Sequence, residues 1–220
     1  ANDLKKLGVK KSKLKVILNP VEIHPKPNDH DDYDKHALHW KDFTGIKILS
    51  VGNLRKNKNY PNLLKALKIL RDKYNQDFIS LIAGDGPEKD SLRSLIQEYS
   101  LENQVILLGG VQYTQSLYRN ADLFVLSSDY EGFGMVLVEA LGYGKTIVAT
   151  DCESGPREIL GNSEHGYLCS VDNPEKLAKS IYEAYLNKLS PDILLKRYKD
   201  FDISLIGKKY LSLMQDMKSD

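Results

Sequence analysis

Short, unbroken apolar runs alternate with amphipathic stretches along most of this chain of 220 residues, and this alternation limits the folds that it can adopt. Continuously apolar strands are buried on both faces of a sheet, and strands separated by helices through short connections run parallel. The runs that predict strands lie at residues 46–51, 78–83, 105–108, 123–126 and 146–149, with a weaker one at 167–168. The pattern therefore predicts an α/β fold with a doubly wound, Rossmann-like parallel sheet.

The stretches between these strands carry a helical signal. Leu63, Leu64, Leu67 and Leu70 form an apolar stripe at helical spacing, and Pro61 suits a first helical turn. Helices are predicted at residues 62–74, 88–99, 114–119, 134–141 and 174–186.

The regions outside the sheet differ from it in composition. Residues 16–21 predict a strand interrupted by the turn signal Asn19-Pro20, and residues 24–39, rich in Pro, Asp and His, predict an exposed segment. We therefore expect four parts. They are an N-terminal extension with an interdomain segment (1–23), a linker or exposed loop (24–44), the sheet domain (45–190) and a C-terminal helical tail (191–220).

Composition and charge disfavour several functional classes. The net charge of +1 argues against a general nucleic-acid binder, which needs a marked basic excess to hold phosphates. Cys152 and Cys169 form no C-x-x-C pair, so neither a zinc site nor a disulfide framework is indicated. Residues 1–15 are polar and lysine-rich, unlike a signal peptide, and no apolar run approaches the roughly 20 residues of a membrane span. We expect a soluble or peripheral protein of a reducing cytoplasm.

In doubly wound sheets, ligands bind where the carboxyl ends of the strands meet loops and helix N-termini. The loop after the first strand, residues 52–60, lacks the G-x-G-x-x-G pattern, which disfavours ordinary NAD binding. It offers instead Arg55, Lys56 and Lys58, which are cations that can neutralise a phosphate. A solvated lysine turn is the alternative interpretation of this loop.

The loop after the fourth strand, residues 127–134, precedes a predicted helix whose free N–H groups and dipole form a natural anion site. Gly132 and Gly134 allow a ligand to approach the backbone closely, so a diphosphate fits there. Glu131 stands before this helix and Glu139 within it, and carboxylates accept hydrogen bonds from the vicinal hydroxyls of sugar or ribose rings. Taken alone, a pair of glutamates at this spacing is more often surface charge.

Several segments together resemble a known family. They are VGNLRKNKN (51–59), IAGDGP (82–87), ADLFVLSS (121–128), EGFGMVLVEA (131–140), SGPRE (154–158), GYL (166–168) and DNP (172–174). In this combination they resemble the C-terminal, donor-binding domain of retaining GT-B glycosyltransferases of glycosyltransferase group 1, or family 4. The resemblance covers nearly the whole chain and makes residues 45–190 the expected nucleotide-sugar-binding domain.

The resemblance implies roles for particular residues. Lys58 and Glu131 form the expected catalytic pair, with Lys58 on the donor diphosphate and Glu131 on hydroxyls of the transferred sugar, while Glu139 binds the ribose diol. The other donor-binding residues that it implies are Gly52, Asn53, Arg55, Gly84, Gly110, Val111, Gly132, Phe133, Gly134, Met135 and Val136. Among these, the backbone amides of residues 133–136 meet sugar and phosphate, and residues 110 and 111 lie against the base. Asn53 stands where the family usually has an arginine, whose charge Arg55 is a candidate to replace.

The resemblance also implies a reaction. A glycosyl group is transferred, with retention, from a UDP- or GDP-linked sugar to a hydroxyl of a glycan, a lipid-linked acceptor or another acceptor, and no metal or other cofactor takes part. The setting is polysaccharide or glycoconjugate synthesis in the cytoplasm, with a peripheral position of the full protein at the inner face of the membrane. Residues 16–23 resemble the interdomain segment and residues 201–214 the terminal helix that packs back on an N-terminal acceptor domain missing from this sequence.

Other interpretations remain open at this point. Asn53 and the missing half are consistent with a non-catalytic sugar-nucleotide-binding module, and a sugar-nucleotide epimerase with the GT-B fold is a further alternative. Cys152 has no histidine placed to activate it, so a nucleophilic role is disfavoured. The other side chains of interest are potential metal ligands for which we favour a solvated linker, because their spacing matches no known site: His24, His30, His36, His39, Asp29, Asp31, Asp32 and Asp34.

Overall fold

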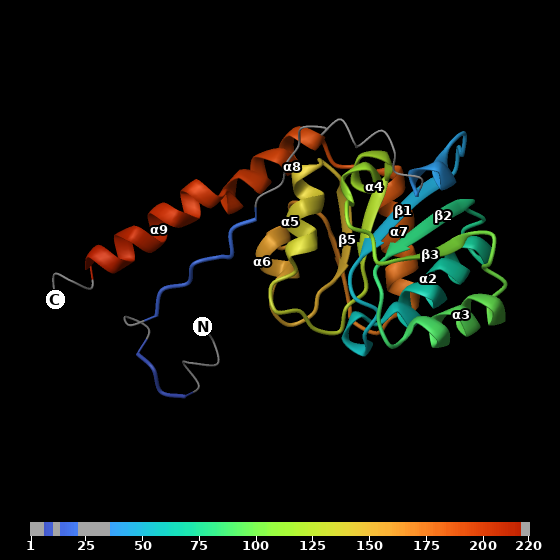
Figure 1. Cartoon of the computed structure of the whole chain (residues 1–220), viewed down its shortest axis with the longest axis horizontal. Coiled ribbons are helices and arrows are strands. Elements are labelled where there is room, and N and C mark those ends of the chain that lie inside the picture. The colour runs from blue at the N-terminus through green and yellow to red at the C-terminus, as the bar shows by residue number, and fades with distance from the viewer. Residues whose placement is uncertain (1–6, 11–13, 22–35, 217–220) are drawn as a thin grey trace.

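The computed structural model describes residues 7–10, 14–21 and 36–216 (Figure 1). Within these residues, six parallel strands form one sheet in the order β3-β2-β1-β4-β5-β6. The strands are β1 (Ile46–Val51), β2 (Phe78–Ala83), β3 (Val105–Gly109), β4 (Leu123–Leu126), β5 (Thr146–Thr150) and β6 (Tyr167–Cys169). This order confirms the predicted doubly wound fold and puts the topological switch point between β1 and β4.

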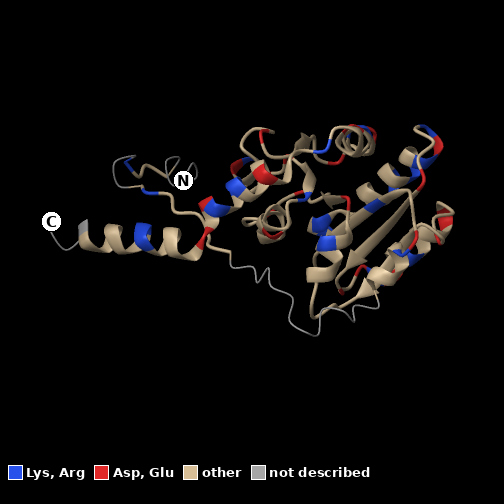
Figure 2. Cartoon of the chain, turned by 90° about the horizontal axis from the view of Figure 1, so that it is seen from above, with Lys and Arg blue, Asp and Glu red and all other residues tan. Residues whose placement is uncertain are grey.

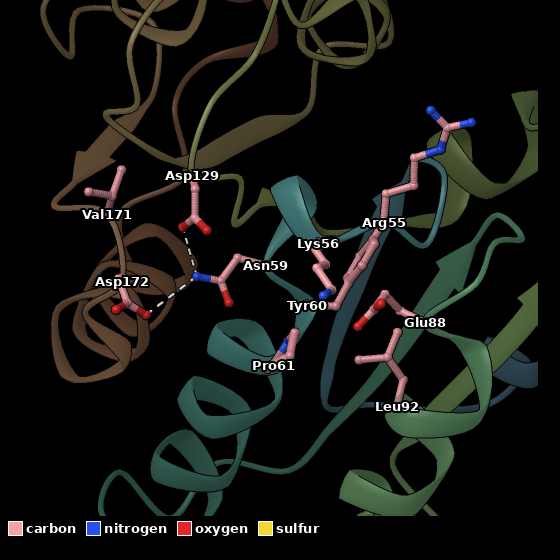
Figure 3. A pocket seen from close by; sticks show the side chains of 10 residues that line it. All are labelled: Arg55, Lys56, Asn59, Tyr60, Pro61, Glu88, Leu92, Asp129, Val171 and Asp172. Atoms are coloured by element: carbon pink, nitrogen blue, oxygen red, sulfur yellow. Dashed lines mark hydrogen bonds between the residues drawn. The ribbon is translucent and has the colours of Figure 1, made fainter.

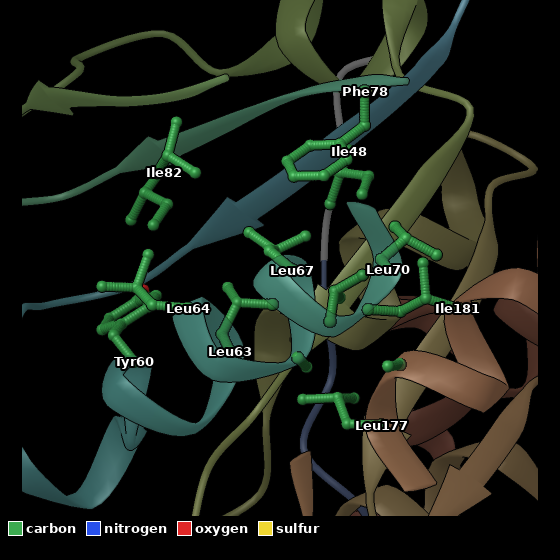
Figure 4. Packing of buried hydrophobic residues seen from close by; sticks show 14 of the residues in the cluster. Ile48, Tyr60, Leu63, Leu64, Leu67, Leu70, Phe78, Ile82, Leu177 and Ile181 are labelled. Atoms are coloured by element: carbon green, nitrogen blue, oxygen red, sulfur yellow. The ribbon is translucent and has the colours of Figure 1, made fainter. Parts of the chain in front are cut away.

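The sheet is buried on both faces, as its apolar strands require. Every residue of β4 and β5 is buried, and β1 pairs with β2 along its whole length, from Ile46 opposite Phe78 to Val51 opposite Ala83. One apolar cluster lies under α2 (Tyr60–Asp72), α3 (Lys89–Glu98) and α7 (Pro174–Leu186), part of which Figure 4 shows. The second cluster lies under α4 (Gln115–Asn120), α5 (Met135–Gly142), α6 (Pro156–Leu160) and α8 (Pro191–Tyr198).

Local sequence signals explain where several helices begin. Proline occupies the first turn of α2, α6, α7 and α8, where its missing N–H costs no hydrogen bond. Asn59 and Asn173 cap α2 and α7, because their side-chain oxygens accept hydrogen bonds from the amides of Asn62 and Lys176. The remaining helical elements are η3 (Ala37–Trp40), η4 (Lys56–Lys58), η5 (Lys199–Phe201) and α9 (Ile203–Asp216).

The N-terminal region differs from the prediction. The strand predicted at residues 16–21 is wrong, since no strand occurs in the described residues 14–21. Asn19-Pro20 interrupts any ladder there, and the Val21 amide donates instead to the Phe201 carbonyl, 3.1 Å away. Within the range 24–44, residues 24–35 lie outside the described part. In the remainder Trp40 is buried, and its indole N–H donates to the Ile79 carbonyl at 3.0 Å.

The C-terminal helix α9 leaves the layered body and runs beside the described N-terminal segment (Figure 1). It carries exposed apolar side chains, including Leu211 and Met214, each 61% exposed. Figure 2 shows charged residues of both signs on the outer helices and loops, whereas the sheet is nearly free of them. No helix in the described ranges has the length and apolar character needed to cross a membrane.

Candidate functional site

The loops that follow β1 and β4 are bonded to each other at the topological switch point. The Ser127 hydroxyl donates to the Lys58 carbonyl at 2.8 Å, and the Asp129 amide donates to the Asn57 carbonyl at 2.8 Å. The Asn59 side-chain amide donates to Asp129 Oδ1 at 2.7 Å, a contact drawn in Figure 3. The cationic loop after β1 is therefore fixed against the loop that carries Glu131.

Lys58 and Glu131, both predicted as site residues, meet at this edge of the sheet. Lys58 Nζ lies 2.6 Å from Glu131 Oε1, and the Ser128 hydroxyl donates to the same oxygen at 2.7 Å. The two charged side chains are only 18% and 8% exposed. Ser128 is itself fixed, because its carbonyl accepts a hydrogen bond from the Thr150 hydroxyl at 2.5 Å. Within the described part of the chain no donor is bonded to Glu131 Oε2, so this oxygen is left for a ligand.

Helix α5 begins at Met135, a short turn after Glu131, and presents its free amides at the same edge. Gly134, the residue that precedes the helix, has φ +90° and makes no side-chain cap, so the first amides of α5 keep their capacity to bind an anion. Gly155, in the loop after β5, also has a positive φ of +95°. A Cβ at Gly155 would lie 1.9 Å from the Phe133 carbonyl oxygen, so only glycine lets this loop close against the entry to α5.

Glu139 lies one turn into α5 and is bonded to a residue that the sequence did not single out. The Tyr118 hydroxyl donates to Glu139 Oε2 at 2.9 Å. Tyr118 is buried, and its ring stacks on those of Phe124 and Tyr143 at centroid distances of 5.6 and 5.2 Å. Burial, reinforced by the charge of Glu139, raises the pKa of Tyr118 well above its ordinary value, so the phenol stays a hydrogen-bond donor.

Close glycine contacts shape the ends of β1 and β2. A Cβ at Gly84 would lie 2.0 Å from the Gly52 carbonyl oxygen, and the Gly84 amide donates to the Gly109 carbonyl at 2.8 Å. The Tyr60 hydroxyl donates to the Gly52 carbonyl at 3.1 Å. Burial, together with the charge of Glu131, raises the pKa of Tyr60 above its ordinary value. The turn that contains Asn53 is therefore tightly held, while Gly110 on the loop after β3 faces open space.

Arg55 lies apart from the Lys58–Glu131 pair. It lines an open pocket of about 520 Å³ beside α2 and α3, together with Lys56 and Glu88, and neither Lys58 nor Glu131 belongs to that lining. Figure 3 shows its guanidinium directed away from the other labelled side chains. That Arg55 supplies the charge of the arginine usual at position 53 in the family therefore stays a prediction.

The other candidate side chains show no arrangement for nucleophilic or metal chemistry in the described part of the chain. Cys152 is buried, and burial together with the charge of Glu131 raises the pKa of its thiol to about 11, which agrees with the expectation that it is no nucleophile. Among the described residues, no group of three or more His, Cys, Asp or Glu side chains is arranged to hold a metal ion. The histidines and aspartates of residues 24–34 lie outside the described part.

Sequence reasoning missed the residues that hold the two glutamates. Ser128 was part of a quoted motif but had no role assigned, and Thr150 contacts it only because β4 and β5 are neighbours. Tyr118 and Glu139 are 21 residues apart, on α4 and α5, so no local periodicity links them. The contact could have been predicted only if α4 and α5 were known to cover the same face of the sheet.

Comparisons with known proteins identify the family of this chain. Residues 35–201 match the family described as Glycosyl transferases group 1. An N-acetylgalactosamine-N,N'-diacetylbacillosaminyl-diphospho-undecaprenol 4-alpha-N-acetylgalactosaminyltransferase from Campylobacter jejuni is 38% identical over 153 residues, which are 70% of this chain and 40% of the relative. The amylovoran biosynthesis glycosyltransferase AmsD from Erwinia amylovora is 34% identical over 172 residues, 76% of this chain and 48% of the relative.

Among solved structures, Anabaena Alr3699/HepE in complex with UDP-glucose superposes with a TM-score of 0.80 at 23% identity, covering 98% of this chain and 61% of that one. At this identity the similarity shows the fold alone, which is the C-terminal, Rossmann-like half of the GT-B fold. The chain spans less than half the length of the two curated relatives above. Because the family match extends over well more than half of its residues, this chain belongs to the glycosyl transferases group 1.

Proposed function

We propose that this chain is the donor-binding domain of a retaining glycosyltransferase of family 4, which binds a nucleoside diphosphate sugar and transfers the glycosyl group to a hydroxyl acceptor. The observation that carries the proposal is the meeting of the Lys58 ammonium, the Glu131 carboxylate and the N-terminus of α5 at one edge of the sheet. The names of the two relatives, an N-acetylgalactosaminyltransferase and an amylovoran biosynthesis enzyme, support polysaccharide or glycoconjugate assembly as the setting.

In the proposed mechanism, negative charge develops on the leaving diphosphate as the glycosidic bond to phosphate breaks. Lys58 and the first amides of α5 stabilise this charge electrostatically. In this mechanism Lys58 exchanges its contact with Glu131 for one with phosphate. The departing phosphate assists the incoming hydroxyl on the same face, so neither a covalent nucleophile nor a metal takes part.

The two glutamates position the donor rather than transfer protons. Glu131 Oε2 accepts hydrogen bonds from hydroxyls of the transferred sugar while Ser128 holds Oε1, and Glu139 binds the ribose diol. Gly52 and Gly84, whose close packing excludes a side chain at Gly84, are assigned to the diphosphate, and Gly110 and Val111 to the base. The group 1 match argues against the epimerase alternative.

The acceptor side belongs to the rest of the protein. We propose that an N-terminal domain supplies the acceptor contacts and covers the exposed apolar side chains of α9, such as Leu211 and Met214. The full enzyme would then act in the cytoplasm, at the inner face of the membrane, on a glycan or lipid-linked acceptor.

Isothermal titration of this chain with UDP, GDP and their sugar conjugates tests the proposal. We expect binding of at least one nucleotide series, and Lys58→Met should weaken it by about tenfold or more, because a charge-assisted phosphate contact is lost. Lys65→Met is the matched control, since Lys65 is exposed on α2 away from Glu131, and it should leave affinity unchanged. Absence of binding by the unmodified chain to every nucleotide would refute the donor site.

A further inference from the structure

The contact between Tyr118 and Glu139 joins a rigid, buried ring to a carboxylate of the candidate site. The tyrosine ring is 1% exposed and lies parallel to the Tyr143 ring, with an interplanar angle of 2°, and it also stacks on Phe124. A buried ring packed in this way keeps its hydroxyl oxygen in one place. The position of this oxygen, 2.9 Å from Glu139 Oε2, is therefore set by the core, and its O–H rotates to donate to the carboxylate.

Glu139 is half-buried, and the Tyr118 hydroxyl is bonded to it. A glutamate without such a partner samples several rotamers, and ordering it on binding costs conformational entropy. The Tyr118 hydroxyl lies 2.9 Å from Oε2 but 3.5 Å from the Val136 carbonyl, so the carboxylate is its main acceptor. In the described residues no hydrogen bond reaches the other carboxylate oxygen, Oε1.

We propose that Tyr118 is a positioning residue for nucleotide recognition: its hydroxyl holds Glu139 Oε2 and thereby aims Oε1 at the ribose diol of the donor. This inference rests on the proposed function, because it takes Glu139 as the ribose-binding carboxylate. It adds a residue that does not touch the donor itself but sets how well the site distinguishes ribose from deoxyribose.

The phenol suits this role chemically. Burial keeps it protonated near neutral pH, so it donates to Glu139 Oε2 and leaves Oε1 to accept from the ribose hydroxyls. A lysine or arginine in its place would neutralise the carboxylate and weaken it as an acceptor of ribose hydroxyls.

The test compares UDP with 2′-deoxy-UDP by isothermal titration, or GDP with 2′-deoxy-GDP if the chain binds only guanine nucleotides. The unmodified chain should prefer the ribonucleotide by about tenfold or more, as expected for a hydrogen bond to a charged group. Tyr118→Phe should reduce this preference to within about threefold, mainly by weakening the ribonucleotide. The Tyr118→Phe variant keeps the ring and lacks only the hydroxyl. Thermal unfolding checks that it is folded.

Tyr182→Phe provides the matched control. Tyr182 is a half-buried ring of the opposite core cluster that packs at a tilt against Tyr74, with ring centroids 4.8 Å apart, so removal of its hydroxyl should leave the preference intact. In a Glu139→Ala background the preference should already be lost, and adding Tyr118→Phe should not lower it further.

The possible results distinguish a failure of the Tyr118 role from a failure of the donor site. If Tyr118→Phe weakens both nucleotides equally, or changes neither, the positioning role is refuted while the donor site stands. If the unmodified chain binds UDP and 2′-deoxy-UDP alike, Glu139 is not the ribose ligand and both the assigned contact and this inference fail. A selective loss of the ribose preference in Tyr118→Phe, absent in Tyr182→Phe, supports the inference.

Discussion

At the scale of single residues, both glutamates of the E-x7-E segment are held through one carboxylate oxygen. Lys58 and Ser128 bind Glu131 Oε1, and Tyr118 binds Glu139 Oε2. The other oxygen of each carboxylate is free of hydrogen bonds from the described residues. A site arranged in this way is ordered before the ligand arrives, which lowers the entropy cost of binding.

Gly155 is the residue on which the shape of this edge depends most directly. Gly155→Ala should lower the free energy of unfolding by about 2 kcal/mol or more, because its Cβ would clash with the Phe133 carbonyl and its positive φ disfavours alanine. Urea unfolding measures the effect. The control is Gly132→Ala, whose Cβ would meet no atom within 4 Å, and equal stability of the two variants would contradict the assignment.

The two thiols should be unreactive in the folded chain. Burial raises the pKa of both Cys152 and Cys169 to about 11, so at pH 8 roughly one thiol in a thousand is ionised, far fewer than in an unfolded chain with a pKa of about 8.5. Alkylation by iodoacetamide, followed by mass spectrometry, should be slow at pH 8, rise as the pH approaches 11, and be fast at pH 8 in urea. Equal alkylation rates of the native and the urea-unfolded chain at pH 8 would contradict the expected protection of the thiols.

At the scale of elements, the C-terminal tail is joined to the loop that precedes α5. Phe201, at the end of η5, is buried, and its ring meets that of Phe133 edge-on at a centroid distance of 6.0 Å. Its carbonyl accepts the Val21 amide, so one short element links the N-terminal segment with the entry to α5. Elements far apart in the sequence thus support the same loop.

Phe201→Ala should therefore destabilise the whole domain, by about 3–5 kcal/mol as is usual for a buried phenylalanine. Leu211→Ala on α9 is the control, since Leu211 is 61% exposed and its loss should change stability by no more than about 0.5 kcal/mol. Thermal or urea unfolding of both variants distinguishes them. A Phe201→Ala variant as stable as the control would mean that the tail does not support the domain.

The sequence predicted most of these elements because continuous apolar runs bounded by Gly, Pro or Asn have few other structures available. The strands at 46–51, 78–83 and 123–126 have the bounds that were expected. The errors arose where tertiary contacts decide the structure. Trp40 follows a polar, aspartate-rich segment yet is buried, because the sheet face carrying Ile79 accepts its indole. Helix α6, with five residues, was not predicted because it is too short to show a periodic stripe, whereas α8 lies within the range 191–220 that was expected to be helical.

The candidate site was predicted only in part. Loop position after parallel strands and the family resemblance together predicted that Lys58 and Glu131 share a site, and the structure brings them within 2.6 Å. The supporting contacts of Tyr118 and Thr150 were not predictable, since they depend on which helices and strands become neighbours. The role of Arg55 was also beyond the sequence, because the direction of a long side chain in a turn is set by local packing.

At the scale of the whole molecule, the chain is a sheet domain whose parallel strands end at one edge, with helix α9 extending away from it (Figure 1). Lys58, Glu131 and the N-terminus of α5 lie at that edge, so a donor bound there would remain accessible to a second domain. The isolated chain should accordingly bind nucleotide but transfer sugar inefficiently, because its acceptor contacts reside elsewhere in the proposed enzyme.

The most direct test of the donor site is a set of calorimetric titrations of the unmodified chain, Glu131→Gln and Glu139→Gln, each with a nucleoside diphosphate and with its sugar conjugate. If Glu131 contacts the sugar and Glu139 the ribose, Glu139→Gln should weaken both ligands by a similar factor of about ten, whereas Glu131→Gln should weaken the sugar conjugate selectively. Undiminished binding of the sugar nucleotide by both variants, or no nucleotide binding by the unmodified chain, would contradict the account.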